Sequence, residues 1–130
     1  MSKPVAKGGD TVVGIDTHIV MIPSPGGPVP TPMPMPFNGK LQDSLSTTVF
    51  IDGQGVAVVG SVANNSPAHV PSGGPFQKSP TNKATVSSGS DTVFADDKKV
   101  ARLGDSATCC NDPSDQDTGK IVASGTVLAG

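Results

Sequence analysis

One segment of the chain occurs twice and decides the fold: residues 47–61 read TTVFIDGQGVAVVGS, and residues 91–105 read DTVFADDKKVARLGD. The two copies align without a gap, so that Val49 lies 44 positions before its counterpart Val93. Each copy has a Thr-Val-Phe run, then a turn (DGQG or DDKK), and then Val-Ala-x-x-Gly. β-Branched and aromatic residues on both sides of a short turn rich in Asp and Gly are typical of a β-hairpin.

A third copy of the unit is divided between the two ends of the chain. Residues 3–10 (KPVAKGGD) correspond to the second half of the unit, and residues 124–130 (SGTVLAG) correspond to its first half. This pattern predicts three pseudo-equivalent units in a single domain over residues 1–130: residues 3–18 with 124–130, residues 47–69, and residues 91–110. We expect the first and last strands to pair and to close the ring.

The composition favours an all-β chain with a thin core. The sequence contains 16 Gly and 13 Pro, four Phe, no Trp and no Tyr, and all of its acidic residues are Asp. Good helix formers are scarce, and a small core needs a metal ion or a partner to offset the entropy lost on folding. We predict a small pseudo-threefold β-pyramid of short strands. Two Pro-rich segments, 21–37 and 66–80, are expected to be loops, with Met33, Met35 and Phe37 packing inward.

Charge and hydropathy exclude several classes of partner. The net charge of −2, the scattered basic residues and the lack of stacking aromatics argue against nucleic acid. No stretch approaches the about 20 apolar residues of a membrane span, so we expect no membrane anchor. The N-terminal residues MSKPVAKGGD have no hydrophobic signal region, and we expect assembly in the cytoplasm without a Sec signal.

Histidine and cysteine recur at similar places in the three units. His18 lies nine residues after Gly9, and His69 lies nine residues after Gly60. In the third unit, Cys109 and Cys110 follow the corresponding glycine by five and six residues. Equivalent positions converge on a pseudo-threefold axis, and two imidazoles with one or two thiolates form a tetrahedral zinc site.

Other readings of these residues stay open. The histidines can be separate hydrogen-bonded side chains, and the cysteines can be small apolar fillers or a reactive thiol. A disulfide between adjacent cysteines is strained. A small Cys–His hydrolase built on Cys109 or Cys110, or a zinc-dependent enzyme, is the catalytic alternative. The segment NDPSDQD (residues 111–117) lacks the spacing of a calcium loop and is expected to be a solvated turn.

The three Val-Ala turns resemble a known family. PVAKGGD, GVAVVGS and KVARLGD are similar to the Pro-Ala-Ala-Arg-x-Gly-Asp unit of the PAAR-repeat proteins, and the resemblance spans nearly the whole chain. The stretch DTHIVMIPSPGGPVPTP resembles the PAAR-like proteins of contractile injection systems, found in type VI secretion and in extracellular phage-tail-like particles.

The resemblance implies a structural protein without catalysis. Such a protein, a monomer by itself, caps a trimeric VgrG-like β-helical spike with one copy per trimer and sharpens it, with effector proteins as further candidate partners. It is delivered outside the cell with the particle. One structural zinc ion, held by His and Cys, stiffens its apex. A free-standing structural β module, which would trimerise by itself, is a further alternative.

The chain departs from the family pattern at several positions. Val58 stands where Arg is expected, and Ser61 replaces Asp. Family zinc sites often use three His and one Cys, whereas this chain has two His. The predicted ligands are therefore His18, His69, Cys110 and Cys109, or one cysteine with water or a carboxylate such as Asp16. The spacing of the classical family unit favours Cys109, whereas the resemblance of TCCNDP to similar proteins of injection particles favours Cys110, which we take as the first choice.

Overall fold

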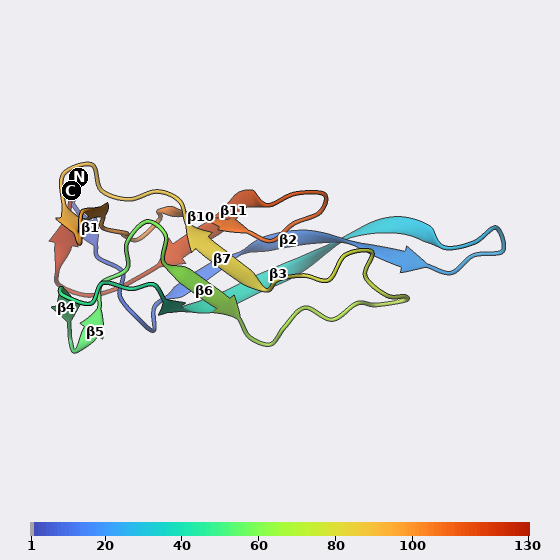
Figure 1. Ribbon diagram of the computed structural model, residues 1–130, viewed down its shortest axis with the longest axis horizontal. Coiled ribbons are helices and arrows are strands. Elements are labelled where there is room, and N and C mark those ends of the chain that lie inside the picture. Colours follow the sequence, from blue (N-terminus) through green and yellow to red (C-terminus); the bar gives the residue numbers. More distant parts are fainter. Residues whose placement is uncertain (1) are drawn as a thin grey trace.

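The computed structural model describes residues 2–130 as an elongated all-β molecule (Figure 1). No helix in this range is long and apolar enough to cross a membrane. The all-β prediction is confirmed. The strands within the range are β1 (Lys3–Pro4), β2 (Thr11–Ile22), β3 (Val29–Asp43), β4 (Phe50–Ile51), β5 (Gln54–Gly55), β6 (Val62–Asn65), β7 (Lys83–Val86), β8 (Phe94–Ala95), β9 (Lys98–Lys99), β10 (Ser106–Cys109), β11 (Gln116–Val122) and β12 (Leu128–Ala129).

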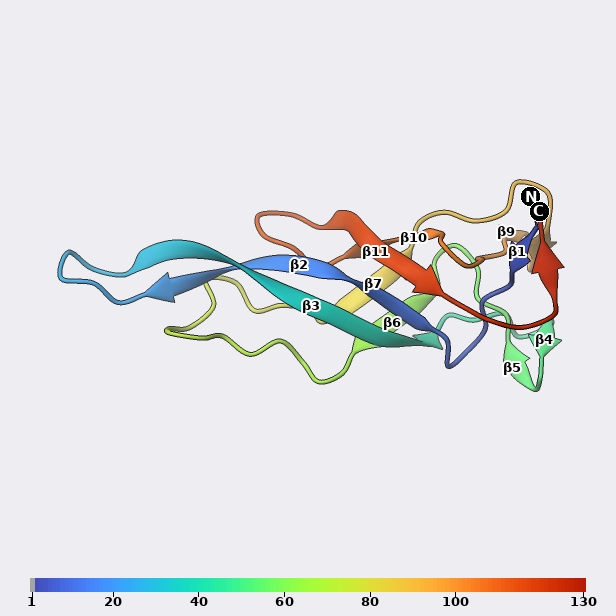
Figure 2. The same ribbon diagram turned by 180° about the vertical axis from the view of Figure 1, so that it is seen from behind.

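Three short antiparallel ladders form one end of the molecule, which we call the base. They are β4 with β5, β8 with β9, and β1 with β12. The last pair joins the two ends of the chain, with Lys3 opposite Ala129 and Pro4 opposite Leu128 (Figure 2). The predicted pairing of the first and last strands is therefore confirmed, and the divided unit is completed at the base.

Three alanines, one from each unit, form a ring at the centre of the base. Ala6 donates its N–H to the carbonyl of Ala101, Ala57 donates to Ala6, and Ala101 donates to Ala57, each over 2.9 Å. All three are fully buried. This closed ring of backbone hydrogen bonds takes one residue from each unit, and it explains why Val-Ala recurs in the sequence: a small side chain is needed where three backbones meet.

The hairpin turns of the two intact units have a left-handed backbone. Asp52 and Gly53 have φ of 52° and 77°, and Asp96 and Asp97 have φ of 51° and 64°. Two consecutive residues with positive φ are the signature of a type I′ turn, whose twist matches that of the paired strands. The short Asp- and Gly-containing turns expected from the repeat are therefore present.

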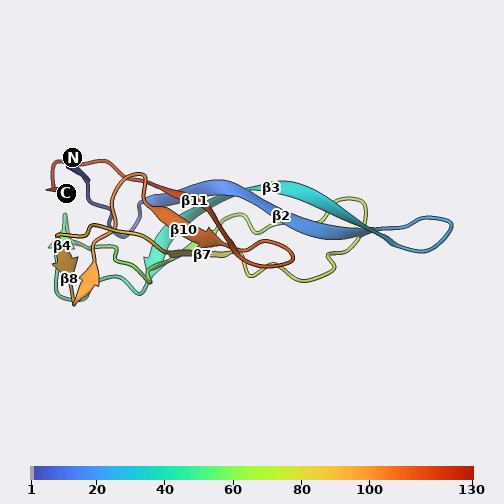
Figure 3. The ribbon, with the colours of Figure 1, turned by 90° about the horizontal axis from the view of Figure 1, so that it is seen from above.

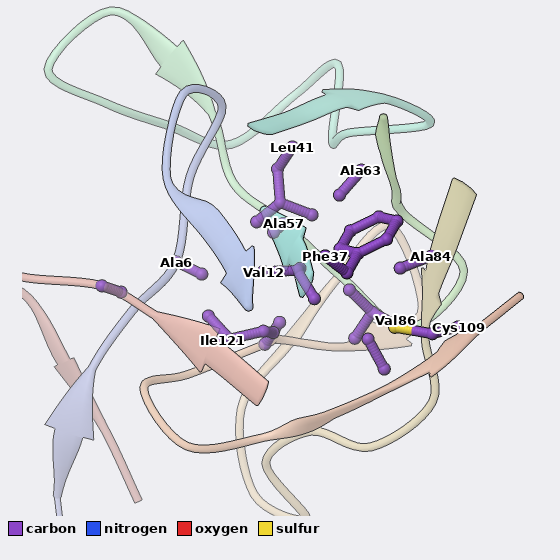
Figure 4. Packing of buried hydrophobic residues seen from close by; sticks show 13 residues of the cluster. Ala6, Val12, Phe37, Leu41, Ala57, Ala63, Ala84, Val86, Cys109 and Ile121 are labelled. Carbon is purple, nitrogen blue, oxygen red and sulfur yellow. The ribbon is translucent and has the colours of Figure 1, made fainter. Parts of the chain in front are cut away.

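Above the base, six longer strands close into an antiparallel barrel in the order β10-β11-β2-β3-β6-β7. Each unit contributes one pair: β2 with β3, β6 with β7, and β10 with β11. Alternate residues point inward, as in β7 and β10, and fill the barrel with small and medium side chains around the single aromatic ring of Phe37 (Figure 4). This core consists of Ala6, Val12, Phe37, Leu41, Ala57, Ala63, Ala84, Val86, Ala101, Ala107, Cys109, Ile121 and Ala123.

The pair β2–β3 extends beyond the barrel as a long hairpin (Figure 3). The expectation of a loop over residues 21–37 holds only for residues 23–28, because β2 continues to Ile22 and β3 begins at Val29, directly opposite it. Met35 and Phe37 are buried as expected, and Met33 is half-buried. Residues 66–80 form a loop, in which Phe76 makes one bridge to Val20.

The prolines of β3 are compatible with a strand because of their register. Three amides of β2 point away from β3 and donate elsewhere: those of Thr17, Ile19 and Met21. The β3 residues opposite them are Pro34, Pro32 and Pro30, respectively. These prolines occupy non-hydrogen-bonded positions of the ladder, where a missing N–H faces the outer edge and costs no ladder bond.

Candidate metal centre

The candidate site lies where the barrel meets the projecting hairpin, and β2 supplies half of it. Asp16 and His18 are two residues apart on the inward face of β2, and both are fully buried. Cys110 follows the last residue of β10, and His69 lies in the loop after β6. Each of the three barrel pairs, or the connection between its two strands, thus delivers at least one ligand side chain to the same place.

The four side chains converge closely. One ligand atom from each of Asp16, His18, His69 and Cys110 lies within 4.8 Å of every other. Nε2 of His69 is 2.8 Å from Oδ2 of Asp16. The Cys110 sulfur is 3.4 Å from that oxygen and 3.6 Å from Nε2 of His18. Metal–ligand bonds of about 2.0–2.3 Å at tetrahedral angles separate ligand atoms by roughly 3.3–3.8 Å, so the group has the size of a zinc site.

Unpaired polar atoms occur at the candidate site and directly behind it. Within residues 2–130, the buried side-chain atoms without a hydrogen-bond partner are Oδ1 of Asp16, Nδ1 of His18 and Oδ1 of Asp112. A buried polar group left unpaired costs about 1–3 kcal/mol. Of the three atoms, only Oδ1 of Asp16 belongs to a carboxylate of the candidate ligand group, and a cation bound beside Asp16 would offset the cost of burying that carboxylate. A divalent cation fits this set of two imidazoles, one thiol and one carboxylate.

The environment adjusts the protonation of the ligands. Burial, and then the charge of His69, lower the pKa of His18, against the opposing effect of Asp112 and Asp16. A neutral imidazole is the form that binds a metal. Burial, followed by the charge of Asp16, raises the pKa of the Cys110 thiol. Metal binding there has to displace the thiol proton, which makes the affinity depend on pH.

Cys109 is not brought into this group. The structure places it in the barrel core, with both cysteines as free thiols. A Cβ on Gly119 would lie 2.7 Å from the Cys109 sulfur, so the absence of a side chain on β11 makes room for it. Burial, and then the charge of Asp16, raise the pKa of Cys109 to about 12. Of the four predicted ligands, the structure therefore assembles His18, His69 and Cys110, with Asp16 as the fourth member.

The two residues that follow Cys110 differ from the expectation based on the sequence. Asn111 and Asp112 are buried, so the expectation of a solvated turn over residues 111–117 is wrong for its first two positions. Their side chains accept the N–H groups of Thr17 and Ile19 over 2.7 and 2.9 Å. They act as substitutes for a paired strand along the outer edge of β2. The one available signal was their position directly after the candidate ligand Cys110.

The base carries an exposed apolar surface at the opposite end of the molecule. Its members follow the repeat, since each unit contributes a Val followed by a large apolar residue: Val49 and Phe50, Val93 and Phe94, and Val127 and Leu128. Their exposed fractions range from 38 to 57%. These residues line a cavity of about 270 Å³ together with Val5, Val56 and Val100, each of which directly precedes an alanine of the ring. Contiguous exposed apolar surface of this kind marks an interaction site.

The C-terminal part of the chain is similar to a known family. The family model described as PAAR motif matches residues 77–130, a range that contains β7 to β12 and Cys110. No curated protein and no solved structure matches the chain. The resemblance to the PAAR-repeat proteins is therefore confirmed, through the C-terminal part of the chain.

Proposed function

We propose that this PAAR-repeat protein is the metal-stiffened tip of a contractile injection system and caps its trimeric spike. The PAAR match supports a spike-tip role, since PAAR proteins in general sit on the VgrG spike. The observation that carries the proposal for this chain is the threefold ring of Ala6, Ala57 and Ala101 above an exposed apolar base. A base with three similar units matches three identical subunits.

The pseudo-symmetry predicts the stoichiometry of the complex. One chain presents three Val-Phe or Val-Leu pairs, so a trimer accepts one copy, with each unit facing one subunit. Exposed strand edges at the base can also continue the β-structure of the partner. Effector proteins are further candidate partners. The protein is assembled in the cytoplasm and delivered outside the cell as part of the particle.

The second part of the proposal is one structural zinc ion bound by Asp16, His18, His69 and Cys110. Zinc suits a ligand set of two imidazole nitrogens, one sulfur and one carboxylate oxygen. A site with four protein ligands has no open position for substrate, which supports a structural role over a hydrolytic one. Asp16 and His18 are also inaccessible to solvent. The ion would join β2, the loop after β6 and the end of β10.

Docking is tested by mixing the chain with a trimeric VgrG-like spike protein and weighing the complex by native mass spectrometry. We expect one chain per trimer. The double variant Phe50→Asp with Phe94→Asp places charges on the base and should abolish the complex. Val29→Asp, at the far end of the hairpin, is the matched control and should bind normally. Three chains per trimer, or an unaffected base variant, would contradict the docking proposal.

Metal binding is tested separately on the untagged protein. We expect one zinc ion per folded chain, lost on acidification, and a lower zinc content together with a lower melting temperature in His69→Ala. An unchanged melting temperature and an unchanged metal content in that variant would contradict the role of His69.

A further inference from the structure

Asp112 lies behind His18, on the side away from the four candidate ligands. The backbone holds it there at two points, because its N–H donates to the carbonyl of Thr17 over 2.8 Å and its Oδ2 accepts the N–H of Ile19 over 2.9 Å. Thr17 and Ile19 are the two neighbours of His18 along β2. The carboxylate is therefore fixed relative to the imidazole through the strand that carries it.

The two nitrogens of His18 face different partners. Nε2 is 3.6 Å from the Cys110 sulfur, inside the ligand group. Nδ1 is 3.6 Å from Oδ2 of Asp112, on the opposite side of the ring. That distance is too long for a hydrogen bond, and Nδ1 is one of the buried atoms without a partner. Oδ1 of Asp112 also lacks one, although the exposed Lys78 ammonium approaches it at 3.4 Å.

We propose that Asp112 is a positioning residue for the metal centre, accepting the Nδ1 proton of His18 when Nε2 binds the ion. The inference rests on the proposed zinc site. A neutral imidazole that binds a metal through Nε2 carries its proton on Nδ1, and a carboxylate facing Nδ1 selects that tautomer and the ring orientation. A small movement of the ring toward the ion or of the carboxylate toward the ring completes the hydrogen bond and satisfies Nδ1.

The second imidazole has a different environment. Nδ1 of His69 lies 3.3 Å from the amide nitrogen of Asn65. The amide oxygen of Asn65 is already used, because it accepts the N–H of Asn38 over 2.9 Å. His69 therefore faces a donor where His18 faces a carboxylate. Of the two histidines, His18 is the one already arranged to bind through Nε2, and Asp112 is the residue that arranges it.

The test compares zinc affinity and thermal stability in Asp112→Asn. Asparagine keeps the shape of the side chain and the one oxygen that both accepts the N–H of Ile19 and faces Nδ1 of His18, so the variant removes only the negative charge that strengthens the hydrogen bond from Nδ1. Zinc affinity is measured by competition with a chromophoric chelator. We expect it to fall by about 10–100-fold. Asp117→Asn, an exposed carboxylate of the same segment, is the matched control and should bind zinc as the wild type does.

Two further readouts separate positioning from a general structural role. The metal-free form of Asp112→Asn should melt no lower than the metal-free wild type, because it no longer buries a charged group with an unpaired oxygen. Only the stabilisation by zinc should decrease. In a His18→Ala background, Asp112→Asn should have no additional effect on zinc affinity, since the residue acts through that ring. The Co²⁺-substituted wild type and variant should differ in their d–d absorption.

Three results would overturn the inference while leaving the proposed metal centre in place. The first is equal zinc affinity in Asp112→Asn and the wild type. The second is an equal loss of stability with and without zinc, and the third is an undiminished effect in the His18→Ala background. A wild-type protein that binds no zinc would overturn the metal centre itself and this inference with it. That result is distinct from a wild type that binds zinc and a variant that binds it equally well.

Discussion

Nε2 of His69 lies 2.8 Å from Oδ2 of Asp16, although 53 positions separate the two residues in the chain. The contact joins the loop after β6 to the inward face of β2, across the end of the barrel. It also makes Asp16, rather than Cys109, the fourth member of the candidate ligand group, a choice that the sequence left open between a second cysteine and a carboxylate. We therefore expect the two adjacent cysteines to behave differently.

Replacing Cys110 should remove the metal, whereas replacing Cys109 should not. Cys110→Ser loses a thiolate from the ligand group, and we expect native mass spectrometry to show little or no bound zinc. Cys109→Ala removes a buried core atom and should lower the free energy of unfolding in urea by roughly 1 kcal/mol, with zinc retained. Zinc loss from Cys109→Ala would place the second thiol among the ligands and contradict this assignment.

Glycine at position 97 should stabilise the hairpin turn of the third unit. Asp97 has φ of 64°, a conformation that glycine adopts more easily, and the equivalent position of the second unit is already Gly53. Asp97→Gly should therefore raise the free energy of unfolding by up to about 1 kcal/mol, measured by chemical denaturation. Gly53→Asp is the reverse change at the matching site and should lower it. Destabilisation by Asp97→Gly would show that the carboxylate has a role in the turn.

The prolines of β3 should keep the hairpin monomeric. Within residues 2–130, β6 pairs with β3 only from Gly39 onward, so no strand covers the outer edge from Pro30 to Pro36. Because prolines supply no N–H at the outward-facing positions, this edge offers no donors to an added strand. The double variant Pro32→Thr with Pro34→Thr restores two donors, and we expect concentration-dependent association in sedimentation velocity.

Pro25→Thr is the control for the edge, since it changes a proline in the turn between the two strands. It should remain monomeric at the concentrations where the double variant associates. If the double variant also stays monomeric up to high concentration, the prediction is wrong, and the prolines do not act to prevent association of the hairpin edge.

Asp96 should make the contact between the second and third units sensitive to acid. Its carboxylate accepts hydrogen bonds from the hydroxyls of Thr48 and Ser46 and from the N–H of Thr47. The hydrogen bond from Thr48, and then that from Ser46, lower the pKa of Asp96 from its ordinary value of 3.8. A lowered pKa in the folded state stabilises the protein above the ordinary value, and the effect is lost as the pH falls through the folded-state pKa.

Melting curves of Asp96→Asn and the wild type between pH 7 and pH 2 test this. The wild type should melt a few degrees higher at neutral pH, and the difference should shrink below about pH 4. Asp52→Asn, at the equivalent turn position of the second unit, is the matched control. A difference that persists unchanged at pH 2 would mean that the charge of Asp96 is not the cause.

The repeat in the sequence predicts the base well, because each hairpin depends on local residues: a Thr-Val-Phe run, a turn and Val-Ala. The barrel was harder to predict, since β2–β3, β6–β7 and β10–β11 occupy equivalent places without similar sequences. The prolines of β3 led to the prediction of a loop. Whether they fit a strand depends on the register of β3 with β2, which local sequence does not determine. The equal offsets of His18 and His69 located the site. Asp112 was missed because its burial results from its contact with the edge of β2, 93 positions away from Ile19.

The ring of Ala6, Ala57 and Ala101 has a consequence for any particle built on a true threefold axis. A chain with three similar units can be seated on a symmetric trimer in three orientations, related by rotations of one third of a turn. Three equivalent placements favour binding by a statistical factor of three, about 0.65 kcal/mol. The units differ at positions such as Leu128, so the three populations need not be equal. The long β2–β3 hairpin belongs to one unit alone and would point in a different direction in each orientation. Image averaging with imposed threefold symmetry would therefore blur the hairpin while leaving the base sharp.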